Sequence, residues 1–104
     1  FSFVEKMPAF KGGSEALKKF ISEHLVYPLE AIEKEIQGTV YIKFIVRMDG
    51  TLTDFEVIRS LHPSMSKAAL DVVKLTQGDW MPGEQKGEKV DVYNTVAVKF
   101  SLKD

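Results

Sequence analysis

The chain has 104 residues, of which 44% are hydrophobic, and its formal net charge of −1 at pH 7 argues against nucleic-acid binding, which needs a basic excess. A chain of this size forms one compact domain that buries about two-thirds of its unfolded surface. It has no cysteine, which excludes a disulfide framework and a thiolate metal site, and no apolar run reaches the ~18–20 residues of a membrane-spanning helix.

The first thirteen residues are expected to be irregular. Residues 1–13 contain a proline and two adjacent glycines, which predicts an irregular segment. The chain opens at Phe1 with neither a methionine nor a signal-like stretch. We therefore expect residues 1–104 to be a single domain taken from a longer protein.

Two helices are predicted next. Ser14 is an expected N-cap, and apolar residues then recur at spacings of three and four as far as His24, which predicts an amphipathic helix. Tyr27-Pro28 breaks this helix and begins a second, short one, because proline suits a first helical position. Gly38 lies beyond its end.

A hairpin follows the helices. Residues 39–48 alternate between apolar and polar, which predicts a strand with one buried face. Asp49 and Gly50 accept the positive φ angles of a tight turn, and residues 51–60 form the return strand. A helical stripe from Met65 to Thr76 and a loop from Gly78 to Lys89 complete this region.

The last strand is the most informative element. Val90 to Leu102 alternates with a period of two, and six of its seven inward positions are apolar, with Asn94 the exception. Its length of about thirteen residues exceeds the usual five or six. A strand that outruns its neighbours leaves backbone groups unpaired, which either cause aggregation or dock another extended chain. We interpret it as a docking strand; an ordinary core strand with a frayed end is the alternative.

The order of elements predicts the fold class. Helix, short helix, strand, strand, helix, strand gives an α+β two-layer sandwich in which helices cover one face of a three-stranded sheet. A parallel pairing of the last two strands would need a right-handed crossover. We favour a fully antiparallel sheet, because alternating polar-out strands suit a sheet with one face in water.

Several short motifs follow one another along nearly the whole chain: Met7-Pro8-Ala9-Phe10 with Gly12-Gly13, Tyr27-Pro28 with Ala31, Gly38-Thr39-Val40 opening a strand to Val46, Asp49-Gly50, Val57-Ile58, Ala68-Ala69-Leu70, Trp80-Met81-Pro82-Gly83, and Val98-Lys99-Phe100. Their order and spacing resemble the C-terminal domain of the TonB energy-transducer family. The leading motif resembles the version of this domain common in the Bacteroidetes.

The resemblance implies a non-enzymatic periplasmic binding domain without a cofactor, tethered to the inner membrane by an N-terminal helix that this sequence does not contain. In the family, that helix couples to a proton-driven inner-membrane complex. The domain captures the box peptide of an outer-membrane receptor by adding it as a strand beside the last strand. The residues then expected to bind the partner are Val90, Asp91, Val92, Tyr93, Asn94, Thr95, Val96, Ala97, Val98, Lys99, Tyr27 and Pro28.

Two other functions stay open. The same domain also ends membrane sensor proteins related to antibiotic-responsive peptidases, so the chain is alternatively an interaction domain of such a sensor. Self-association through the same strand would give a strand-paired homodimer. An H-E-x-x-H motif or a Pro-rich linker in the parent would discriminate transducer from sensor.

Structural explanations compete with functional ones at several residues. Tyr27-Pro28 is a helix-start device first and a partner surface second, and Trp80 is expected to plug the core rather than clamp a ligand. His24 and His62 are far apart in sequence and lack a third ligand at metal spacing, so we expect surface or capping roles. The carboxylates show no pairing suited to acid–base catalysis.

Overall fold

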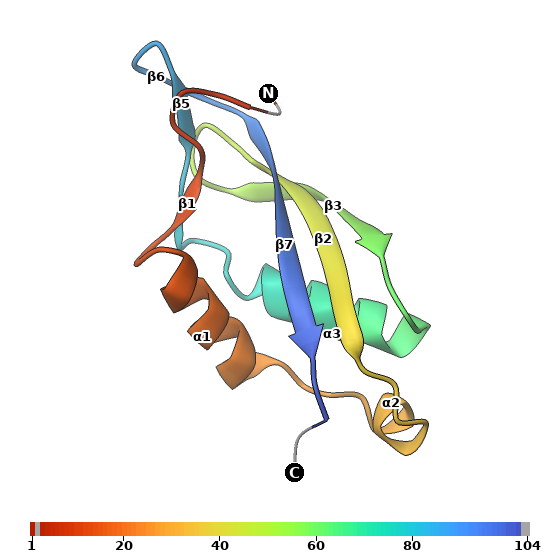
Figure 1. Ribbon diagram of the computed structural model, residues 1–104. Helices are drawn as coiled ribbons and strands as arrows, with labels where there is room; N and C mark the ends of the chain where they lie inside the picture. The colour runs from red at the N-terminus through yellow and green to blue at the C-terminus, as the bar shows by residue number, and fades with distance from the viewer. Residues whose placement is uncertain (2, 103–104) are drawn as a thin grey trace.

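A three-stranded antiparallel sheet forms the centre of the protein (Figure 1). The computed structural model describes residue 1 and residues 3–102. The sheet order is β3-β2-β7, with β2 at Gly38–Val46, β3 at Leu52–Arg59 and β7 at Val92–Phe100. The antiparallel sheet favoured from the sequence is therefore confirmed, and β3 and β7 are its two outer edges.

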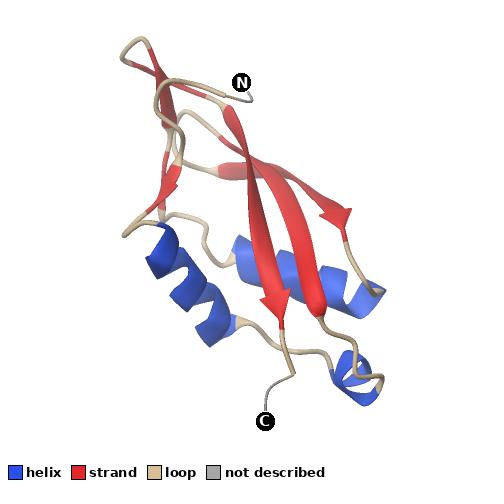
Figure 2. Cartoon of the chain, in the orientation of Figure 1, coloured by secondary structure: helices blue, strands red, loops and turns tan. Residues whose placement is uncertain are grey.

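Three helices accompany the sheet: α1 at Ser14–His24, α2 at Leu29–Glu33 and α3 at Pro63–Lys74. The longest, α3, packs across one face of the sheet, as the secondary-structure colouring of Figure 2 shows. Gly13, and not Ser14, is the N-cap of α1, because the helix already includes Ser14. His62 caps α3 by accepting a hydrogen bond at Nδ1 from the Ser64 backbone N–H at 3.1 Å, which agrees with the expected capping role.

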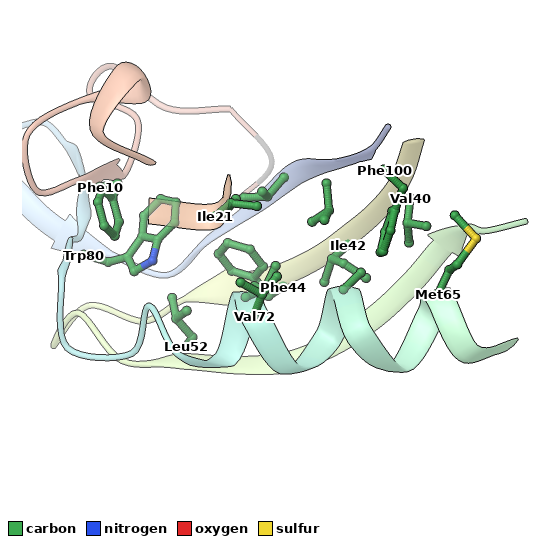
Figure 3. Packing of buried hydrophobic residues seen from close by; sticks show 14 of the residues in the cluster. Phe10, Ile21, Val40, Ile42, Phe44, Leu52, Met65, Val72, Trp80 and Phe100 are labelled. Atoms are coloured by element: carbon green, nitrogen blue, oxygen red, sulfur yellow. The ribbon is translucent and has the colours of Figure 1, made fainter. Parts of the chain in front are cut away.

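The core lies between α3 and the covered face of the sheet (Figure 3). Phe44 is fully buried, and its ring centroid lies 5.4 Å from that of Trp80 and 5.8 Å from that of Phe55. Phe10 meets Trp80 edge-on at 5.7 Å, which joins the N-terminal segment to the same cluster. Trp80 is therefore a core residue, and its indole Nε1–H donates to the Thr76 hydroxyl at 2.9 Å.

The expected loop from Gly78 to Lys89 is instead largely paired. It contains β4 at Trp80–Met81 and β5 at Gly83–Gln85, which are followed by β6 at Glu88–Val90. β5 and β6 form a hairpin, whereas β4 pairs with β1 at Ala9–Phe10, inside the segment predicted to be irregular. Strands of two or three residues are too short to show alternation, so the sequence pattern did not reveal them.

Gly83 allows this region to approach the sheet closely. A Cβ at Gly83 would lie 2.8 Å from Cγ2 of Val92 and 2.9 Å from the carbonyl oxygen of Lys6, both closer than real Cβ contacts. Only glycine lets the backbone pass here.

Within the part of the chain that the structure describes, no helix is both long and apolar enough to cross a bilayer.

Candidate partner-binding edge of the sheet

β7 is an edge strand, but it does not outrun its neighbour. It pairs with β2 residue for residue, from Phe100 opposite Gly38 to Val92 opposite Val46, without a register shift. Both strands have nine residues, so the predicted overhang is wrong. Val90 belongs to β6, where it pairs with Gly83. The alternation of the sequence continued past the strand because it reports extended backbone, not pairing.

The unpaired side of β7 still exposes backbone groups. The N–H of Tyr93 donates to the carbonyl oxygen of Phe1 at 2.8 Å, so it points away from β2. In a regular antiparallel strand the hydrogen-bonding direction alternates with a period of two, so Thr95, Ala97 and Lys99 also direct their N–H and C=O outward. We call these outward groups of Thr95, Ala97 and Lys99 the docking edge.

The intervening residues serve the fold instead. Asn94 and the residues at 92, 96 and 98 direct their backbone groups to β2. Val92, Val96 and Val98 also bury their side chains, with at most 5% exposed. Asn94 is half-buried and lies opposite Phe44 in regular register. These four of the predicted partner residues therefore face β2 with their backbone groups and hold the sheet together.

Phe1 already occupies the outward side of β7 at the start of the strand. The terminal ammonium of Phe1 donates to the carbonyl oxygen of Asp91 at 2.9 Å, while the carbonyl oxygen of Phe1 accepts from the N–H of Tyr93. Phe1 thus bonds to the residues on both sides of Val92, the slanted pattern of a parallel bridge. Among the residues that the structure describes, no hydrogen bond reaches the outward groups of the docking edge.

The opposite edge of the sheet, β3, is bonded by a side chain at its first residue and is irregular beyond it. The side chain of Gln77 accepts from the N–H of Leu52 at 2.7 Å and donates to its carbonyl oxygen at 3.1 Å. Two register irregularities interrupt the pairing of β3 with β2, and Asp54 lies within the one between Thr53 and Glu56, at a φ of 57°. Bulges and covered ends are the usual protection of an edge against added strands. The two edges therefore differ in accessibility.

A hollow of about 480 Å³ adjoins the docking edge. Lys18, Ile21 and Ser22 of α1 form one wall. Ala97 and Lys99 of β7 line it from the sheet, with Thr39 and Tyr41 of β2 behind them. The helix α1 therefore flanks the C-terminal half of β7 and leaves a space between itself and the strand. In Figure 1, α1 lies beside the C-terminal half of β7, on the side away from β2.

A charged contact fixes the start of β7. The carboxylate of Asp91 accepts from the backbone N–H of Met48 at 2.8 Å and from Nη1 of Arg47 at 3.0 Å. These hydrogen bonds, the Met48 bond first, lower the pKa of Asp91 below its ordinary value. The contact joins the turn between β2 and β3 to the beginning of β7, which sets the register of the edge.

Tyr27 and Pro28 do not lie on the docking edge. The hydroxyl of Tyr27 donates to the carbonyl oxygen of Ile36, and its ring meets Phe100 edge-on at 5.3 Å. Burial raises the pKa of this phenol. Pro28 lines a separate hollow of about 330 Å³ together with His24. These contacts support the structural explanation of Tyr27-Pro28: the pair holds α2 against the end of β7.

Three further residues define the site, and the sequence pattern did not identify them. Phe1 occupies the outward side of β7 at its start, Lys18 flanks the C-terminal half of β7, and Gln77 bonds to the first residue of β3. Each acts across a long sequence separation, so no local spacing reveals its role. His24 and His62 show no metal-site geometry: no group of three or more potential ligands occurs among the described residues.

Comparisons with known proteins give one family. The model of the family described as Gram-negative bacterial TonB protein C-terminal matches residues 23–102. The solution structure of the Helicobacter pylori TonB C-terminal domain, residues 194–285, is similar with a TM-score of 0.65 and 25% identity over 86% of this chain and 94% of that chain. The solution structure of a longer form of that domain, residues 179–285, is similar with a TM-score of 0.67 and 26% identity over 89% of this chain and 87% of that chain. No curated protein matches in sequence.

Proposed function

Because the chain belongs to the TonB C-terminal family, the interaction domain of TonB-type energy transducers, we propose that its docking edge captures the box peptide of an outer-membrane receptor. The peptide adds as a fourth strand beside β7. TonB C-terminal domains are periplasmic in Gram-negative bacteria. In this proposal an N-terminal helix outside the present sequence tethers the domain to an inner-membrane proton-driven complex, and pulling on the captured peptide transmits force to the receptor.

The observation that carries this proposal is the difference between the two edges. Both are outer strands of the same sheet, yet Gln77 and two bulges protect β3, whereas the outward groups of Thr95, Ala97 and Lys99 have no partner among the described residues. An unprotected regular edge is a liability unless it has a partner. Strand addition makes use of such an edge.

The expected affinity is modest. Three residues with one N–H and one C=O each offer six groups, and about six net hydrogen bonds at roughly 0.5–1.5 kcal/mol give about 3–9 kcal/mol. Association itself costs on the order of 4–15 kcal/mol, so side-chain burial must supply the rest. We expect a Kd of about micromolar at best. A transducer that releases its receptor after each cycle requires such an affinity.

The test is a titration with short overlapping peptides from the N-terminal regions of outer-membrane receptors of the same genome. We expect one peptide per receptor to bind and to slow amide hydrogen exchange at Thr95, Ala97 and Lys99. A peptide with proline at alternate positions is the control, since it cannot complete the ladder. Binding that leaves these amides unchanged, or concentration-dependent dimerisation that protects them without any peptide, would contradict the proposal.

A further inference from the structure

The first 22 residues precede the part of the chain that the family model matches, yet they supply both neighbours of the docking edge. Phe1 lies beside the start of β7, and α1 flanks its far half (Figure 1). We propose that this N-terminal segment makes the edge selective: Phe1 stops the guest strand before Tyr93, and Lys18, with Lys99, binds a carboxylate side chain of the guest. This inference rests on the proposed function and names the class of peptide, an acidic extended one.

The stop follows from backbone geometry. An added strand needs the N–H and C=O groups that point outward, and of these the carbonyl oxygen of Asp91 and the N–H of Tyr93 are bonded to Phe1 at 2.9 and 2.8 Å. A guest cannot use them without displacing Phe1. Val4 keeps the segment in place, because it is 3% exposed and only three residues further along the chain. The guest therefore pairs only with the stretch from Thr95 to Lys99.

The preference for a carboxylate follows from the hollow beside this stretch. Its lining includes the ammonium-bearing side chains of Lys18 and Lys99 and the hydroxyls of Ser22 and Tyr41, but no carboxylate. Ala97 also lines the hollow, and its small side chain leaves the space open. Lysine and hydroxyl groups donate hydrogen bonds to a carboxylate, and opposite charge steers an acidic peptide to the site.

Lys18 remains available to a guest. Its Nζ lies 3.6 Å from Oε2 of Glu15, but the two side chains are 76% and 88% exposed. Exposed ion pairs of this kind contribute little, so exchange of Glu15 for a guest carboxylate costs little. Lys19, the next residue of α1, is also exposed but does not line the hollow. It provides a matched control.

The stop is tested by amide exchange and by two proline variants. In the free protein we expect slow exchange at Tyr93 and fast exchange at Thr95, and of these two amides only that of Thr95 slows when the peptide binds. Tyr93→Pro then changes the Kd by less than about twofold, whereas Thr95→Pro weakens binding about 5- to 150-fold. Tyr93→Ala, which keeps the N–H, controls for loss of the ring. Equal weakening by both proline variants would overturn the stop.

The carboxylate preference is tested by charge reversal. Lys18→Glu is expected to weaken binding of the receptor peptide about 2- to 10-fold, an effect that salt reduces. Lys19→Glu should change the Kd of the receptor peptide by less than about twofold, although both variants place a new carboxylate near Glu15 on the helix. Changing the Asp or Glu of the peptide to its amide should abolish the difference between Lys18→Glu and the unmodified protein.

The outcomes separate this inference from the proposed function. If no receptor peptide protects Thr95, Ala97 and Lys99, the proposed function fails and the inference with it. If peptides do protect these amides but lack an acidic residue, or bind Lys18→Glu and Lys19→Glu equally well, strand addition stands and selection by the N-terminal segment is refuted.

Discussion

Replacement of Thr95 by proline tests strand addition most directly. Proline has no backbone N–H, and the N–H of Thr95 points outward from β7, where the fold does not use it. Proline is tolerated at such positions on edge strands. We therefore expect Thr95→Pro to fold with nearly unchanged stability, because no hydrogen bond of the sheet is lost.

The effect on binding is larger. The variant removes one of about six ladder hydrogen bonds and leaves a carbonyl of the guest without a donor, which costs about 1–3 kcal/mol. This free energy corresponds to an increase of about 5- to 150-fold in the Kd of a receptor peptide. Titration calorimetry measures the Kd, and urea denaturation followed by circular dichroism checks the fold.

Two variants complete this experiment. Thr95→Ala keeps the N–H and should bind nearly as well as the unmodified protein. Asn94→Pro removes an N–H that points to β2, so it should destabilise the sheet itself. Strand addition at β7 is refuted if folded Thr95→Pro binds the peptide with an unchanged Kd, or if Thr95→Ala loses as much affinity as Thr95→Pro.

Three further predictions concern the scaffold. Phe44→Ala should lower the free energy of unfolding by about 3–5 kcal/mol in urea denaturation, because the ring is fully buried; a loss below about 1 kcal/mol would contradict the core described above. Gln77→Leu leaves the N–H and C=O of Leu52 unpaired, so it should lower the free energy of unfolding by about 1–3 kcal/mol and promote self-association through β3. Sedimentation measures the self-association, and Gln77→Glu is the control because its carboxylate can still accept from the N–H of Leu52. The lowered pKa of Asp91 gives stability above about pH 4 that is lost as pH falls through the folded-state value. Asp91→Asn should therefore be less stable than the unmodified protein at neutral pH, with a difference that narrows in acid, and a pH-independent difference would refute this role.

The regular elements could be predicted from the sequence because their signals are local. Alternation identifies β2 and β7, since a strand with one buried face must repeat every two residues. The helical spacing before His24 gives α1 in the same way. These signals, with turn dipeptides such as Asp49-Gly50 in the expected order, were enough to predict the antiparallel sheet and the family. Element ends were less well determined, as the N-cap of α1 shows.

The accessibility of each edge could not be predicted, since it depends on contacts between distant residues. Gln77 closes β3 from across 25 positions, and Phe1 covers the start of β7 from across 90. The pairing of β1 with β4 is similarly remote. The sequence therefore determined which segments are extended, through the period of their side chains. Only the tertiary structure decided which backbone groups stay free, because a hydrogen-bond partner is a neighbour in space and leaves no periodic trace in the chain.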